Sequence, residues 1–170
     1  MRATISPIPL LVACAAMVSI LASCAPTYDN IADQMLADTQ KQADTGLLKL
    51  QTLATTIGTL QNSSNSNDQK ALVEAKKQAS YTANADFYDQ LQSSISALET
   101  RMTALSDLST PKLNTALGDL EKNLAQVRST HATENLLGAE YLKASRQLLD
   151  QQFKALTVYE LTIKGGSKPN

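Results

Sequence analysis

Few residues in this chain of 170 have side chains suited to catalysis or metal binding. His131 is the only histidine, and Glu134 follows it at a spacing that can place both side chains on one face of a helix. A zinc site needs three or four ligands, and neither a second histidine nor an available cysteine completes one. We therefore predict that His131 lies in a solvent-exposed turn, and that the protein binds no metal and no cofactor.

Carboxylates could act as a general acid and a general base if two of them lay side by side. Asp86 and Asp89 form one candidate pair, and Asp119 and Glu121 form another. Solvent-exposed helix faces account better for these acids, because the chain has no Glu-x-x-His motif of the kind that di-iron bundles use. It also has no phosphate-binding loop, dinucleotide-binding motif or calcium loop. We predict that the protein is not an enzyme.

Both cysteines, Cys14 and Cys24, lie at the N-terminus, in or just after an apolar stretch from Ile5 to Leu21. Arg2 precedes this stretch and the small residues Ala22-Ser23 follow it, which is the order of parts in a signal peptide. A membrane-spanning helix needs about 20 apolar residues. The stretch is shorter than that, and two prolines interrupt its beginning, so a signal peptide is the better interpretation.

The residues Leu21-Ala22-Ser23-Cys24 resemble the lipobox of bacterial lipoproteins. The resemblance implies that lipoprotein signal peptidase recognises Leu21, Ala22 and Ser23 and removes residues 1–23. It also implies a thioether-linked diacylglyceryl group on Cys24, with residues 24–27 as a lipidated leash. Leu11-Val12-Ala13-Cys14 also resembles a lipobox, but too little apolar sequence precedes it. With Cys14 removed and Cys24 lipidated, no thiol remains for a disulfide, a metal or a nucleophile.

Ala25 follows the lipidated cysteine, and this position influences membrane sorting. In enterobacterial lipoproteins an aspartate here is the usual signal for retention in the inner membrane. Ala25 therefore resembles the residue expected in a lipoprotein that is sorted to the outer membrane. We expect the protein in the outer membrane, facing the periplasm, with the outer leaflet of the inner membrane as the alternative. Two or three acyl chains would make the anchoring stable.

The chain after residue 23 is nearly neutral, with 14 basic and 16 acidic residues that are interspersed. It has no basic stripe, so we predict no nucleic-acid partner. Pro111 is the only proline between Pro26 and Pro169, and leucine, alanine and glutamine are abundant. This composition favours long helices.

Apolar residues three or four positions apart predict four helical segments within a domain of residues 28–166. The first begins near Tyr28, has heptad-like, coiled-coil spacing from Ala43 onward, and ends before the polar linker Gln61–Asp68. Its stripe is thin around Thr39, so we expect looser packing there. The second helix runs from Asp68, as its N-cap, to Leu105.

The third segment begins at Pro111, with Thr110 as its N-cap. Its pattern fades across residues 128–133, and a fourth helix resumes near Thr133 and stops before Gly165-Gly166. Residues 167–170 form a frayed tail. We predict an all-α fold, an antiparallel up-down-up-down bundle of four segments. The alternative is a three-helix bundle in which the last two segments are fused and bent.

Two groups of side chains could fill the core or serve a ligand or partner. Aromatic residues could fill the core or line a pocket, and we favour the core: Tyr81, Phe87, Tyr88 and Tyr141. Leucine pairs widen the apolar faces, which indicates a broad core or, less readily, an exposed strip for a partner helix: Leu47-Leu48, Leu136-Leu137 and Leu148-Leu149.

Lipobox, short leash and helical body together resemble small helical proteobacterial lipoproteins of unassigned function. We expect a membrane-tethered, non-catalytic interaction or structural module that binds another envelope protein or itself. The alternative is a carrier of a small apolar or lipid ligand, bound in a pocket between the helices.

Overall fold

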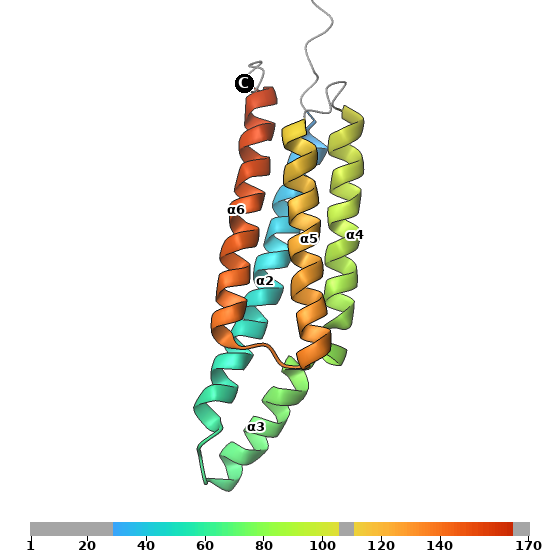
Figure 1. Cartoon of the computed structure of the whole chain (residues 1–170). Helices are drawn as coiled ribbons and strands as arrows, with labels where there is room; N and C mark the ends of the chain where they lie inside the picture. Colours follow the sequence, from blue (N-terminus) through green and yellow to red (C-terminus); the bar gives the residue numbers. More distant parts are fainter. Residues whose placement is uncertain (1–28, 106–110, 165–170) are drawn as a thin grey trace, which may run out of the picture.

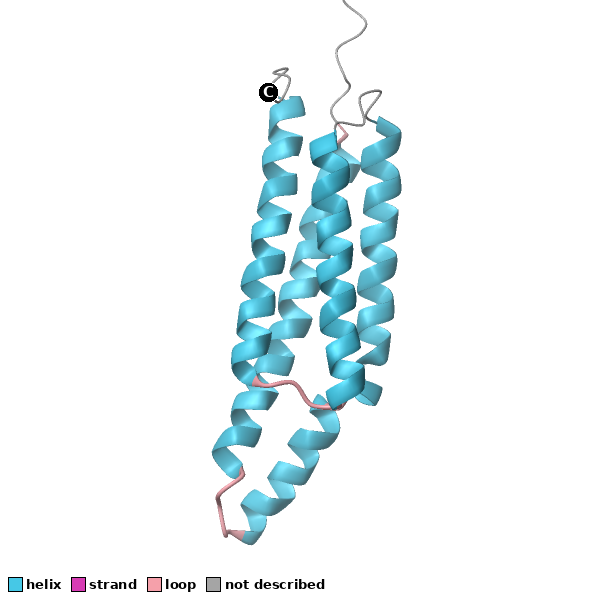
Figure 2. Ribbon diagram, in the orientation of Figure 1, coloured by secondary structure: helices cyan, strands magenta, loops and turns pink. Residues whose placement is uncertain are grey.

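A computed structural model describes residues 29–105 and 111–164, and every regular element in these ranges is a helix (Figure 2). The helices all lie within the predicted domain of residues 28–166. The lipobox residues and Thr110, the predicted N-cap, lie outside the described ranges. The bounds of the helices are α2 (Asn30–Leu60), α3 (Ser66–Ala79), α4 (Tyr81–Leu105), α5 (Pro111–Glu134) and α6 (Ala139–Lys164).

The helices form an antiparallel four-helix bundle, which confirms the predicted fold class (Figure 1). Helix α2 packs against α4 and α6, and α5 packs against the same two helices, so α2 and α5 are diagonal partners. Helices α5 and α6 are separate and antiparallel, which excludes the three-helix alternative. Helix α3 leads directly into α4, so these two helices together form one side of the bundle.

One end of the molecule is a two-helix hairpin, which we call the arm and define as residues 49–79. At the base of the arm Gln51 still accepts a hydrogen bond from Arg146 of α6. Past this point α3 and the last turns of α2 extend beyond the ends of α5 and α6 (Figure 1). Helix α3 packs along α2 and α4, and among the described residues it meets α5 at its last residue, Ala79. The two ends of the described chain, Asp29 and Lys164, lie at the opposite end of the bundle. The arm is therefore the part of the bundle farthest from the N-terminal entry of the chain.

The second predicted helix differs from the structure at its start and in its middle. Asn65, rather than Asp68, is the N-cap of α3, and its side chain accepts a hydrogen bond from the Asn67 amide at 2.8 Å. Asn and Asp cap helices about equally well, and the Asp68 carboxylate instead accepts a bond from the Ser63 hydroxyl. The helix is also broken at Ser80, whose ψ of 152° is extended rather than helical.

The boundary between the last two helices lies later in the chain than the sequence pattern predicts. Helix α5 continues through the faded stretch to Glu134, and α6 begins at Ala139 rather than near Thr133. Asn135 ends α5 with a positive φ of 59°, a conformation that Asn adopts more readily than most residues. Leu136 and Leu137 therefore lie in the connection between the helices and not on α6.

The core runs along one face of each helix, and on α6 this face includes Leu149, Phe153 and Leu156. Ala144 and Leu148 are exposed, whereas Leu142, Ser145 and Leu149 are buried. On α2 the predicted loose region is also packed. Thr39 is only 3% exposed, and its hydroxyl donates to the Met35 carbonyl at 2.7 Å.

The leucine pairs at two sites divide between core and surface, as their positions on the helix require. Leu47 is fully buried while Leu48 is 44% exposed, and Leu149 is buried while Leu148 is 44% exposed. Successive residues are about 100° apart around a helix, so only one leucine of each pair faces the core. The pairs therefore each place one leucine in the core, and a partner strip along the exposed leucines stays a prediction.

Candidate functional site

The lipobox residues Leu21, Ala22, Ser23 and Cys24 lie outside the described part of the chain. The bundle begins five residues after Cys24, where Asp29 caps α2 by accepting a hydrogen bond from the Ile31 amide at 3.0 Å. Among residues 29–105 and 111–164, no helix is both long enough and apolar enough to cross a membrane. The predicted anchor therefore stays a prediction from the sequence.

His131 is buried in the core, so the prediction of an exposed turn histidine is wrong. Its side chain is 0% exposed and lies on α5. The Nε2 atom donates to the Ala79 carbonyl at 2.9 Å, because a carbonyl can only accept. The Nδ1 atom then accepts from the Tyr88 hydroxyl, also at 2.9 Å. Both ring nitrogens are engaged, so the neutral imidazole is the form that this site holds.

Burial sets the protonation of both partners in this pair. Desolvation lowers the pKa of His131, against the weaker opposing effect of its backbone hydrogen bonds. Desolvation also raises the pKa of Tyr88, and the nearby Tyr141 and Tyr81 add to this shift. At neutral pH the histidine and the tyrosine are uncharged. Neither side chain has a free polar atom to offer a metal or a substrate.

The predicted aromatic group packs around this pair, which confirms the core interpretation for three of its four members. The ring centroid of Tyr88 lies 6.1 Å from that of Tyr81 and 5.0 Å from that of Phe87. Phe87 in turn lies against Gly46 of α2, where a Cβ would run into the phenyl ring. Tyr141 is 36% exposed, and its hydroxyl donates to Thr130.

Hydrogen bonds at the same level hold the break between α3 and α4 against the end of α5. The Tyr81 amide donates to the backbone carbonyl and to the side-chain oxygen of Asn135, each at 3.2 Å. The buried Asn84 amide donates to the carbonyls of Gln78 and Ser80, each at 2.8 Å. The cluster of His131, Tyr88, Tyr81, Asn84 and Asn135 is therefore a structural junction of three helices.

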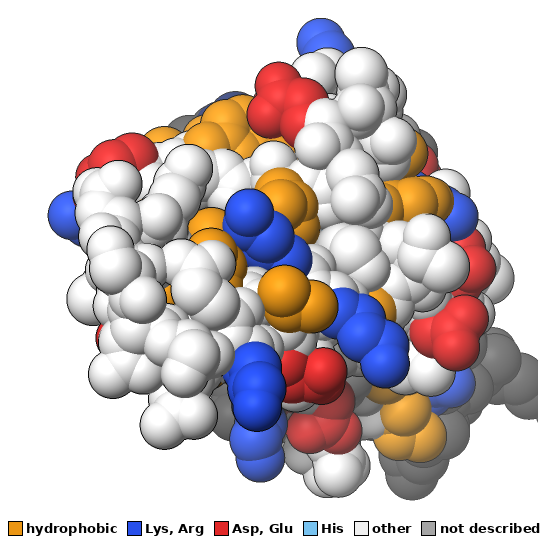
Figure 3. All heavy atoms as spheres, turned by 90° about the horizontal axis from the view of Figure 1, so that it is seen from below, with side chains coloured by type: hydrophobic (Ala, Val, Ile, Leu, Met, Phe, Trp, Pro, Cys, Tyr) orange, Lys and Arg blue, Asp and Glu red, His pale blue; other side chains and the backbone are white. Residues whose placement is uncertain are grey.

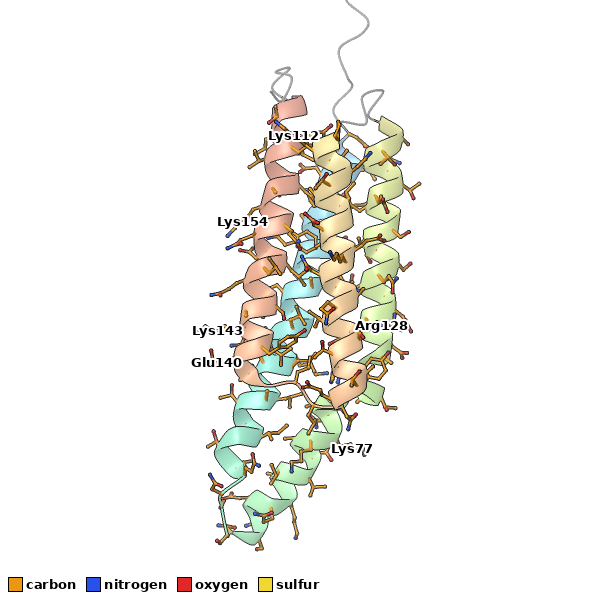
Figure 4. The ribbon with its side chains drawn as sticks, viewed as in Figure 1. Lys77, Lys112, Arg128, Glu140, Lys143 and Lys154 are labelled. Carbon is orange, nitrogen blue, oxygen red and sulfur yellow. The ribbon has the colours of Figure 1, made fainter. Side chains whose placement is uncertain are left out.

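The candidate carboxylates lie at the surface of the bundle, since Asp86 and Asp89 are exposed on α4 and Asp119 is exposed on α5. Asp89 forms an ion pair with Arg128 of α5 at 2.6 Å, and Arg128 also donates to Gln92 and Tyr81 (Figure 4). Asp119 and Glu121 are two positions apart on α5, so they point to different sides of the helix. Within the described residues, no three His, Cys, Asp or Glu side chains are grouped as metal ligands.

A buried acid lies at the opposite end of the bundle, near the entry of the chain. Glu160 is only 6% exposed. Burial raises its pKa, and the charges of Asp33 and Asp29 raise it further. Asp29 itself pairs with Arg101 of α4 at 2.5 Å, which lowers the pKa of Asp29. Three of the described carboxylates, those of Glu160, Asp33 and Asp29, therefore lie close together here, and the Arg101 guanidinium pairs with one of them.

Sequence reasoning missed His131 and Glu160 as core residues for the same reason. His131 follows Val127 by four positions, and Glu160 follows Leu156 by four, so each continues a buried stripe. The spacing contained the signal, but the polarity of the two side chains argued against a core position. A polar residue in phase with an apolar stripe can be buried when hydrogen bonds or a shifted pKa compensate.

Two open grooves on the bundle surface lack the aromatic residues of the junction. One groove of about 710 Å³ lies between α2 and α6, and Arg146 crosses it to pair with Asp44 at 2.7 Å. The other, of about 440 Å³, lies between α5 and α6 beside Ala116 and Leu148. Lys143 and Lys154 project outward from α6 (Figure 4).

Comparison with protein families, curated proteins and solved structures finds no match to this chain.

Proposed function

We propose that the protein is a lipid-anchored envelope lipoprotein whose bundle is a non-catalytic interaction or structural module on the periplasmic side of the outer membrane. The observation that carries this proposal is the lipobox-like sequence Leu21-Ala22-Ser23-Cys24, which directly precedes a folded helical domain. The polar residues that could do chemistry are engaged with each other in the core or exposed singly. The bundle therefore supports binding through its surface better than catalysis.

The geometry of the bundle suits a tether at this point. Five peptide units join Cys24 to Asp29, so this leash spans at most about 18 Å. With lipid on Cys24, the bundle end with Asp29 and Lys164 faces the membrane and the arm points away from it (Figure 1). Helix α2 has 31 residues and is about 46 Å long, so the arm is available to partners away from the bilayer.

The alternative, a carrier of an apolar ligand, has less support from the side chains assigned to it. Tyr88 is fully buried, and Tyr81 and Phe87 pack against the core rather than lining a pocket. Native mass spectrometry of the purified domain separates the two functions, since a retained apolar ligand would favour the carrier.

Lipid attachment is tested by labelling a bacterial host with an alkyne-tagged palmitate analogue and separating its membranes on a sucrose gradient. We expect the wild type and a Cys14→Ser variant to incorporate the label and to sediment with the outer membrane. The Cys24→Ser variant should lose the label and leave the outer-membrane fraction. Label retained in Cys24→Ser, or a wild-type protein found in the soluble fraction, would contradict the proposed anchoring.

A further inference from the structure

The outer face of α3 carries an excess of lysines around an exposed valine, with one acid, Glu74, between Lys70 and Lys77. Lys70, Val73 and Lys77 are three and four positions apart, so they lie on one face of the helix. The opposite face of α3 holds the buried residues Leu72, Ala75 and Ala79. Val73 is 68% exposed, the largest value among the exposed large hydrophobic side chains of the described residues.

Lys76 lies beside this stripe on the same helix. On the other helix of the hairpin, Lys49 is eleven residues before the end of α2, and Lys77 is eleven residues after the start of α3, so these two lysines lie at similar heights. Seen from the arm end, basic side chains cross the centre of the face, with apolar side chains between them (Figure 3).

These lysines have no ion-pair partner among the described residues. The four ion pairs found there involve Arg101, Arg128, Arg146 and Lys154, all in the bundle. The two acids of the arm have other partners: Asp68 accepts from Ser63, and Glu74 accepts from Gln78. With four lysines against two acids, the arm is net positive, whereas the whole chain is net −1.

Resting on the proposed function, we propose that this α3 surface, Lys70, Val73, Lys76 and Lys77, binds an acidic segment of a partner envelope protein. The carboxylates of the partner would pair with lysines on both sides of Val73, and an apolar side chain of the partner would cover the valine. Pairs of this kind set the orientation and the salt dependence of an interface. The arm is the part of the bundle that a tether at Cys24 directs away from the membrane.

The charges favour an acidic protein over two other occupants. A second arm would bring lysines against lysines across a symmetric contact, which is unfavourable. An anionic bilayer needs more than two net charges and one exposed apolar side chain to hold a protein firmly. An acidic protein segment can pair its carboxylates with the lysines and cover Val73 with an apolar side chain.

The test places the photo-crosslinking residue p-benzoylphenylalanine at Val73 of the full-length protein in living cells, with Val158 as the matched control position. Val158 is similarly exposed, at 62%, but lies on α6 in the bundle. We expect one cross-linked protein from position 73 and not from position 158. The cross-linked peptide of that protein should have an excess of Asp and Glu.

Charge reversal decides whether the lysines make the contact. The double variant Lys70→Glu/Lys77→Glu should reduce the cross-linked product about tenfold. The control variant Lys112→Glu/Lys143→Glu, which reverses two exposed lysines of the bundle, should leave it unchanged. Circular dichroism of both variants checks that the helices remain folded.

Several results would overturn the proposal. The first group comprises no cross-linked product from position 73, the same products from positions 73 and 158, or a product whose yield does not change on charge reversal. The second comprises a product of twice the chain mass, which would be a second copy of this chain, or a cross-link to lipid and to no protein. If a protein with its lysines intact carries lipid on Cys24 but gives no charge-dependent product, the arm surface alone is rejected. A charge-dependent product from a chain without lipid would reject the anchoring and leave the arm surface standing.

Discussion

The hydrogen bond between Tyr88 and His131 joins two fully buried side chains on different helices. The hydroxyl donates to Nδ1 at 2.9 Å, while Nε2 donates to the end of α3 at Ala79. A buried acceptor that loses its donor keeps the full cost of desolvation. Removing the Tyr88 hydroxyl should therefore cost more than removing a hydroxyl at the surface.

We expect Tyr88→Phe to lower the free energy of unfolding by about 1–3 kcal/mol, because it leaves the His131 Nδ1 atom buried without a donor. Urea unfolding followed by circular dichroism at pH 7.5 measures the effect. Tyr141→Phe is the matched control, since its hydroxyl is at the surface and bonds to Thr130. Equal decreases in the free energy of unfolding for the two variants would show that the buried hydrogen bond stabilises the protein no more than the surface one.

His131 should make the protein less stable as the pH falls. Its pKa is lowered in the folded state, so below the unfolded value of about 6.5 the unfolded chain binds more protons than the folded one. The stability from the neutral imidazole is present above that pH and is lost as the pH falls toward the folded pKa. Urea unfolding from pH 7.5 to 5.5 should show a smaller loss in His131→Gln than in the wild type.

Glu160 acts in the opposite direction, because burial raises the pKa of its carboxyl from 4.5. Its stabilising protonated form is complete below that value and is lost as the pH rises through the folded pKa. We expect Glu160→Gln to raise the melting temperature at pH 7.5, where the wild type holds a buried charge beside Asp33 and Asp29. Thermal unfolding should show this gain shrink as the pH approaches 4.5; a gain independent of pH would exclude the carboxyl as its cause.

At the level of elements, α2 and α4 approach closely where Gly46 meets Phe87. A methyl group at Gly46 would run into the phenyl ring, which also packs against Tyr88. Gly58, on the same helix, has open space around its Cα. Substitution by alanine at the two positions therefore distinguishes the effect of helix propensity from that of packing.

Alanine favours a helix over glycine by about 1 kcal/mol. We expect Gly58→Ala to stabilise the protein by up to about 1 kcal/mol, and Gly46→Ala to destabilise it because the clash with Phe87 exceeds the gain in propensity. Urea unfolding of the two variants measures the difference. Stabilisation of similar size in both would show that the Phe87 ring moves aside at little cost.

At the level of the whole molecule, the bundle and the arm differ in how many helices share their apolar faces. Leu53, Ile57 and Leu60 in the arm are only half-buried, whereas Leu117, Leu120 and Leu124 of α5 are buried in the four-helix core. Segments with fewer buried apolar contacts open at lower free energy.

Hydrogen–deuterium exchange should resolve this difference. We expect backbone amides of residues 54–60 and 70–78 to exchange faster than those of residues 114–128, because the arm can open without disrupting the core. Mass spectrometry of peptides from these ranges gives the measurement. Uniform protection along α2, α3 and α5 would mean that arm and bundle unfold as one unit.

Much of the architecture could be predicted from the spacing of apolar residues alone. The start of α5 at Pro111 and the all-helical antiparallel bundle follow from local patterns and helix signals. Ser80 was not predicted as a break, because the apolar stripe from Leu72 to Leu91 passes through it without interruption. What separates α3 from α4 there is a set of contacts with Asn135, 54 positions further along the chain.

The sequence by itself determined the helical class of the domain, the direction of its helices and the lipobox-like site before it, because these depend on residues close together in the chain. Tertiary structure decided which polar residues are buried, since His131 and Glu160 take core positions only when other helices cover them. It also decided the shape, because the hairpin of α2 and α3 extends past the ends of α5 and α6, which leave it uncovered. The uncovered hairpin, with its lysines and Val73, exists only because the four sides of the bundle differ in length.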